Sequence, residues 1–102
     1  MAVDIFCYCA TQVDETDRKI AQMRSDRTDL FANSFLLSSA KPLQEVEREI
    51  ASQAGLENGA SLVLLRLNDK SSAARLAEAA YAFRSYFEDG SVVTLFEGEK
   101  PI

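Results

Sequence analysis

The residues whose spacing most invites a chemical interpretation are Cys7 and Cys9. Residues two apart on a strand share a face, so the thiols are neighbours, but this spacing does not suit a disulfide. Zinc would need two more nitrogen or sulfur ligands, and the chain has no histidine and no third cysteine. We therefore predict two buried free thiols in a reducing compartment, and neither a metal site nor another cofactor.

The rest of the chemical inventory argues against catalysis. The absence of histidine removes the usual general base at neutral pH. None of the four glycines falls in a phosphate-binding pattern, there is no G-x-S-x-G segment, and C-x-C is not the C-x-x-C of a dithiol oxidoreductase. We assign no catalytic residue and predict that the protein is not an enzyme, although a small enzyme stays as the third alternative.

Charge limits the choice of partners. The chain has 16 acidic and 11 basic residues, a net charge of −5 and a pI near 4.6. Binding to nucleic acid or to an anionic membrane surface needs clustered Lys and Arg, so we expect neither partner. The sequence also shows no signal peptide and no apolar run of about 18 residues, which favours the cytoplasm. The acidity does allow a basic protein partner.

Five side chains are the candidates for contact with such a partner. Four are acids that should point outward from predicted helices, and the fifth is a tyrosine on an alanine-rich helix face that suits docking. They are Glu45, Glu49, Asp14, Asp17 and Tyr81.

The element that organises the chain is a helix predicted over residues 69–87. Its apolar side chains recur at helical spacing, and an apolar run flanks it on each side, over 61–67 and 91–96. Asp69 can cap its start, and Asp89-Gly90 can end it. The predicted core stripe of this helix consists of Ala73, Leu76, Ala80, Phe83 and Phe87.

The remaining elements follow from the same patterns. The first strand has apolar residues on both faces, as a strand at the centre of a sheet does. The predicted second helix starts at Pro42, carries a core stripe of Leu43, Val46, Ile50 and Ala54, and ends at Gly55. Besides the central helix, the predicted elements are strands over 3–10, 35–39, 62–67 and 92–96 and helices over 11–25 and 42–54. Thr11 is the predicted cap of the helix over 11–25.

These elements define a single small α/β or α+β domain over residues 1–97, followed by a loose tail at 98–102. The order is β-α-β-α-β-α-β, about four strands alternating with three helices, with the sheet covered by helices. Short right-handed crossovers favour at least one parallel strand pair. A ferredoxin-like arrangement is the alternative if the weakest strand or helix does not form as predicted.

Two functional hypotheses of different classes follow from a small acidic domain without catalytic motifs. The first is an immunity protein or antitoxin that neutralises a basic toxin, such as a nuclease, which must itself bind phosphate. The second is a regulatory or ligand-sensing domain that works as a homo-oligomer, in which a homodimer forms through an edge strand or through the face that carries Tyr81.

Overall fold

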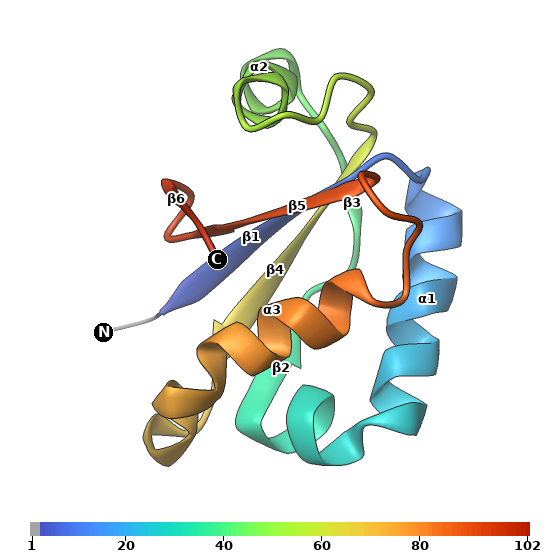
Figure 1. The fold of residues 1–102 in the computed structure, drawn as a ribbon. Coiled ribbons are helices and arrows are strands. Elements are labelled where there is room, and N and C mark those ends of the chain that lie inside the picture. The colour runs from blue at the N-terminus through green and yellow to red at the C-terminus, as the bar shows by residue number, and fades with distance from the viewer. Residues whose placement is uncertain (1–2) are drawn as a thin grey trace.

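The computed structural model describes residues 3–102, which form one mixed sheet-and-helix unit (Figure 1). Besides α-helices and strands it contains a π-helical segment, η1, and a 3₁₀ segment, η2. In chain order the elements are β1 (Asp4–Cys9), α1 (Val13–Asp26), η1 (Asp29–Ser34), β2 (Phe35–Leu37), β3 (Lys41–Pro42), α2 (Glu45–Gln53), β4 (Ser61–Leu67), η2 (Lys70–Arg75), α3 (Leu76–Arg84), β5 (Val92–Phe96) and β6 (Lys100–Pro101).

The sheet has the strand order β2-β4-β1-β5-β6, and the short β3 also pairs with β4. All of these neighbouring strands in residues 3–102 are antiparallel, so the predicted parallel pair is wrong. The reason is that β4 inserts between β1 and β2, which do run in the same direction because both are antiparallel to β4. The fold is therefore α+β, with the strand order of a ferredoxin-like domain and an additional helix, α2, before β4.

Two apolar layers lie on opposite faces of the sheet, as the two-faced pattern of β1 predicts. On one face, Ile5, Cys7 and Cys9 pack against α1, η1 and α3. On the other face, Tyr8 packs with residues of β4, β5, α2 and the loops beside α2. Figure 1 shows α2 alone on its side of the sheet, with α1 and α3 on the other side.

The first helix begins two residues later than predicted, at Val13, and Gln12 is its N-cap residue without a capping hydrogen bond. The Thr11 hydroxyl does not cap the helix; it lies 2.5 Å from the hydroxyl of the fully buried Thr16. Beyond the helix, Leu30 and Phe31 lie in η1 and are almost fully buried, so this helical turn belongs to the core.

The predicted central helix is divided into η2 and α3. Asp69 does cap its start, because its carboxylate accepts a hydrogen bond from the Ser71 amide at 3.1 Å. Phe83 and Phe87 stack in the core with ring centroids 5.2 Å apart. Ala73, predicted in the same core stripe, is exposed, because a 3₁₀ segment turns about 120° per residue and does not continue the α-helical stripe.

The second helix starts at Glu45 and not at Pro42, which pairs with Ser61 as part of β3. Leu43 is buried from the loop before the helix, whereas Val46 is 67% exposed, so the predicted core stripe is wrong in its first turn. The Gln44 amide donates a hydrogen bond to the Glu47 carboxylate at 2.9 Å, which stabilises the later start. The predicted end is confirmed: Gly55 has a φ of 106°, and the Leu56 amide bonds to the carbonyl of Ala51.

The C-terminal segment 98–102, expected as a loose tail, forms β6 and pairs with β5. The two strands are joined by a tight turn at Glu97 and Gly98, whose φ angles of 56° and 77° are those of a type I′ hairpin turn. The Ile102 amide donates to the carbonyl of Thr94 at 3.1 Å, and Arg84 Nη1 donates to the main-chain oxygen of Ile102 at 2.8 Å. The segment is thus held by both β5 and α3.

Candidate partner-binding site

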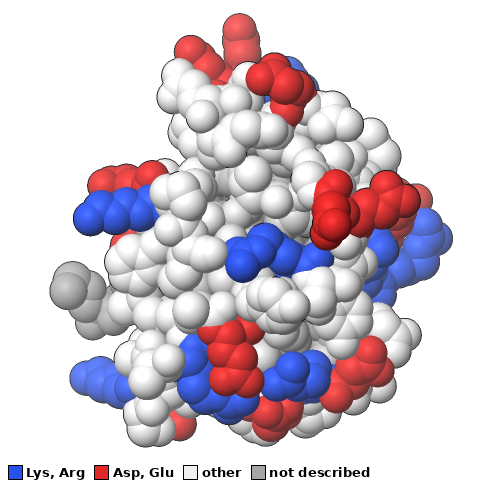
Figure 2. All heavy atoms as spheres, in the orientation of Figure 1, with Lys and Arg blue, Asp and Glu red and all other residues white. Residues whose placement is uncertain are grey.

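The four candidate acids lie on two helices that cover opposite faces of the sheet. Glu45 and Glu49 are exposed on α2, and Figure 2 shows acidic side chains over this helix at the top of the molecule. Asp14 is exposed on α1, where Arg18 lies 3.8 Å away. Asp17 is partly buried, and its carboxylate accepts a hydrogen bond from the Ala40 amide at 2.8 Å. The sheet therefore separates the acids into an α2 pair and an α1 pair.

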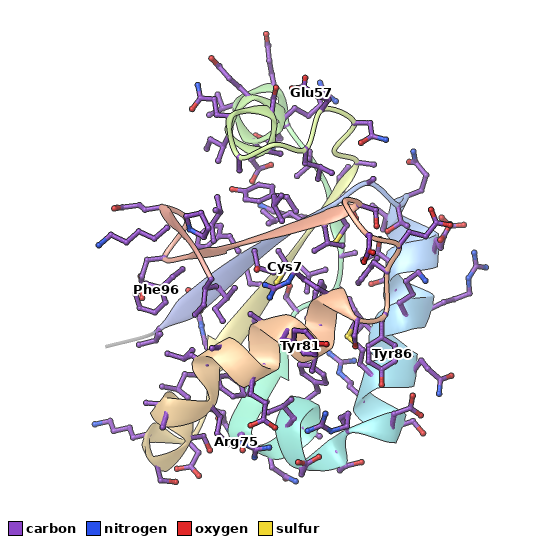
Figure 3. The ribbon with its side chains drawn as sticks, in the orientation of Figure 1. Cys7, Glu57, Arg75, Tyr81, Tyr86 and Phe96 are labelled. Atoms are coloured by element: carbon purple, nitrogen blue, oxygen red, sulfur yellow. The ribbon has the colours of Figure 1, made fainter. Side chains whose placement is uncertain are left out.

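Tyr81 extends from the outer side of α3 and is 70% exposed (Figure 3). It points outward because it is about 200° around the helix from Phe83, which is fully buried against the sheet. Tyr81 lines an open hollow of about 390 Å³ and a second of about 220 Å³. An exposed aromatic ring next to hollows can insert into a partner while the partner fills the hollows beside it.

An ion-pair network borders the smaller hollow. Arg75 donates to Glu78 at 3.0 Å and to Asp29 at 3.2 Å, and Arg27 lies 3.3 Å from Glu78. Hydrogen bonding to Arg75 lowers the pKa of both the Asp29 and the Glu78 carboxyl. These charges are compensated within the chain, so the network joins η1 to α3 and adds little net field to the surface.

The two cysteines lie in the core of the domain. Both are free and buried, and in residues 3–102 no group of three or more Cys, Asp or Glu side chains could hold a metal ion. Burial raises the pKa of the Cys9 thiol to about 12, and burial together with the neighbouring Cys9 raises the pKa of Cys7. The thiols are therefore protonated and inaccessible at neutral pH, as structural cysteines are.

The sequence interpretation missed the surface contributed by β5 and β6. Val92, Leu95 and Pro101 line further hollows beside α2 and α3, at the open side of the sheet. The signal that could have revealed them was Gly98 two residues after the apolar strand, because Gly at the second position of a two-residue turn is typical of a hairpin.

Fold and surface together describe a small α+β domain with an outward aromatic ring and exposed acidic side chains, features that suit a protein-binding module. A family model described as "CDI System Immunity Component" matches residues 1–100. The chain is 30% identical over 99 residues to "Immunity protein CdiI-2" of Burkholderia pseudomallei (strain 1026b), and the match covers 97% of each sequence. The chain belongs to this family of immunity proteins.

A solved structure agrees with this assignment. One chain of the "CdiA-CT/CdiI toxin and immunity complex from Burkholderia pseudomallei" has the same fold, with a TM-score of 0.92 and 28% sequence identity. The similarity covers 97% of this chain and 95% of that one. The sequence-based prediction of an immunity protein is confirmed at the level of the family. Within residues 3–102, no helix is long and apolar enough to cross a membrane.

Proposed function

We propose that this protein binds a CdiA-CT toxin and neutralises it. The observation that carries the proposal is the match over 97% of the chain to one component of a solved toxin and immunity complex. Family membership supports the same class of function, and favours binding over catalysis.

The toxin that fits this protein is basic, as a nuclease domain is. Net charge of −5 on the immunity protein attracts a basic partner over long range and speeds association. A nuclease needs Lys and Arg to bind phosphate, so an acidic inhibitor that covers those residues also blocks the substrate site. The affinity of the complex then falls as ionic strength rises.

The cytoplasm is the compartment that we propose for this interaction. Two free buried thiols suit a reducing compartment, in which they stay unpaired. The acidic balance disfavours nucleic acid and anionic membranes as direct partners. A homodimer of the free protein is an open alternative, which light scattering over a concentration series decides.

The test uses cells that produce the CdiA-CT toxin domain of the same organism, with and without this protein. We expect the protein to restore growth, and the purified pair to elute as one stoichiometric complex whose affinity falls with added salt. An unrelated CdiA-CT toxin is the matched control, because an immunity protein should not protect against it. Growth arrest despite soluble protein, together with no complex, would reject the function.

Charge reversal separates the two acidic surfaces. The double change Glu45→Lys and Glu49→Lys alters the exposed α2 pair, and Asp14→Lys alters α1 at an equally exposed position. Asp17 is unsuitable for this comparison, because its carboxylate holds the Ala40 amide. If α2 faces the toxin, the double change weakens binding and reduces its salt dependence, whereas unchanged affinity removes α2 from the interface.

A further inference from the structure

Four hollows adjoin one another along the side of the molecule that runs from α2 across β5 to α3. Their volumes, in order from α2, are about 400, 210, 390 and 220 Å³. The first two share Ala54 and Pro101, the second and third share Arg84 and Val92, and the last two share Tyr81. These four neighbouring hollows are together named here the β5 groove.

The floor of the β5 groove is the outer edge of β5. Along an antiparallel strand, the backbone groups of successive residues point to opposite sides. The Ser91 carbonyl accepts a hydrogen bond from the Ala10 amide on the β1 side, so the N–H and C=O of the next residue, Val92, point away from β1. The pairing between β5 and the C-terminal segment ends at Thr94, which accepts from Ile102. Within residues 3–102, the Val92 N–H and C=O therefore have no strand beside them. Val92 is only 8% exposed, so an added strand would pair with β5 over this one short stretch of its edge.

The surface around the β5 groove combines apolar area with uncompensated negative charge. Figure 2 shows a mostly uncharged area between α2 and α3, with basic side-chain atoms at its centre and left and acidic side chains over α2 and at the right. Glu88 and Asp89 line the third hollow, and Glu99 lines the first hollow. Glu49 lies one helical turn before Gln53, another residue that lines the first hollow. In the described part of the chain, none of these four acids is in an ion pair.

The positive charge in the β5 groove is engaged internally. Arg84 donates to the Thr94 hydroxyl and to the main-chain oxygen of Ile102, and thereby holds β6 against α3. Arg27, at the far end, is paired with Glu78 at 3.3 Å. The four unpaired acids outnumber Arg84, which keeps its positive charge, so the charge that a partner meets is predominantly negative. The exposed Tyr81 ring lines the third and fourth hollows.

We propose that the β5 groove is the surface that receives the toxin, an assignment that rests on the proposed function. An extended segment of the toxin lies along the groove, forms hydrogen bonds with the backbone of Val92, and packs apolar side chains beside Tyr81. Basic side chains of that segment meet Glu88 and Asp89 at one end and Glu49 and Glu99 at the other. The occupant is thus a basic segment with apolar residues at intervals.

Binding to the purified CdiA-CT domain tests this assignment with two groove variants and two matched controls. Tyr81→Ser removes the exposed ring, and Glu88→Lys with Asp89→Lys reverses the rim charge. Leu36→Ser removes another exposed apolar side chain, 46% exposed on β2, and Asp14→Lys reverses a charge on α1, both outside the groove. All five positions are exposed, so we expect the four variants to fold like the natural protein, which circular dichroism verifies.

We expect Tyr81→Ser to weaken binding by about 30-fold, as loss of a hot-spot aromatic does, and the charge reversal by about tenfold or more. The two controls should change affinity by less than about threefold. In the complex, amide exchange at Val92 should slow at least about tenfold, because strand pairing would protect that amide.

The possible outcomes separate this assignment from the function on which it rests. If the natural protein binds the toxin and the groove variants bind equally well, or if Asp14→Lys is the damaging change, the β5 groove is not the interface. If the free protein is a dimer that Tyr81→Ser dissociates, the groove belongs to a second copy of the chain. If the natural protein does not bind or neutralise the toxin, the proposed function fails as well.

Discussion

The substitution Thr16→Val tests the polar contact that joins α1 to the sheet. Thr16 is fully buried, and its hydroxyl lies 2.8 Å from the Ser61 hydroxyl, 2.5 Å from that of Thr11, and 2.9 Å from the carbonyl of Gln12. Ser61 in turn donates to the carbonyl of Thr11 at 2.8 Å. These contacts connect the β1–α1 loop, the first turn of α1 and the start of β4.

Valine keeps the shape of threonine but removes the hydroxyl. Two to three hydrogen bonds are lost at about 1 kcal/mol each, so we expect unfolding to become easier by about 2 kcal/mol. For a domain of this size, that lowers the melting temperature by roughly 10 °C. Ser61→Ala should cost less, because Thr16 can still bond to Thr11 and Gln12.

Urea unfolding of both single variants and the double variant, followed by circular dichroism, measures the coupling between the two hydroxyls. We expect the double variant to lose about 1 kcal/mol less than the sum of the single losses, because the two groups share one contact. A Thr16→Val protein as stable as the natural one, or a strictly additive cycle, would refute the role of this contact. Leu36→Ser serves as the control, because Leu36 is exposed on β2.

Three further predictions concern the core, the C-terminus and the thiols. Phe83→Ala removes a fully buried ring stacked on Phe87, and urea unfolding should show a loss of about 3–5 kcal/mol; a loss below about 1 kcal/mol would contradict the packing. Deletion of residues 100–102 removes β6 and its bonds to Thr94 and Arg84, and should cost about 1–3 kcal/mol, whereas a loose tail would cost nothing. Burial raises the pKa of Cys9 from 9.0 to about 12, so the folded protein keeps a proton that the unfolded chain releases. The free energy of unfolding should therefore decrease as pH rises from about 9 towards 12. Cys9→Ala should remove part of this decrease, and an unchanged pH profile of stability in the variant would contradict the prediction.

Local patterns predicted most of the elements and both faces of the central strand. Alternation in β1 placed Ile5 and Cys7 on one face and Tyr8 on the other, and both faces are covered as predicted. The helical spacing of Phe83 and Phe87 identified the buried face of α3, and therefore the outward position of Tyr81. These features depend on residues close in sequence, whose geometry a single helix or strand already determines.

Errors arose where contacts between distant segments decide the structure. Pro42 suits the first position of a helix, yet it pairs with Ser61 in β3 and delays α2 to Glu45. The segment 98–102 has few apolar residues, and only its pairing with β5 and the bond from Arg84 order it. The antiparallel sheet likewise depends on β4 inserting between β1 and β2, which no local pattern records.

For the candidate site, the sequence alone predicted a basic protein partner, and the tertiary structure shows the surface to which our proposal assigns that partner. Net charge of −5, the missing histidine and the lack of catalytic motifs can be read from the sequence, and they led to the hypothesis of an acidic inhibitor of a basic protein. The β5 groove exists only because β5, the end of α2 and α3 come together in the folded chain. Net charge is a sum over the residues, so the sequence alone shows it. A surface is made by segments that folding brings together, so only the tertiary structure shows it.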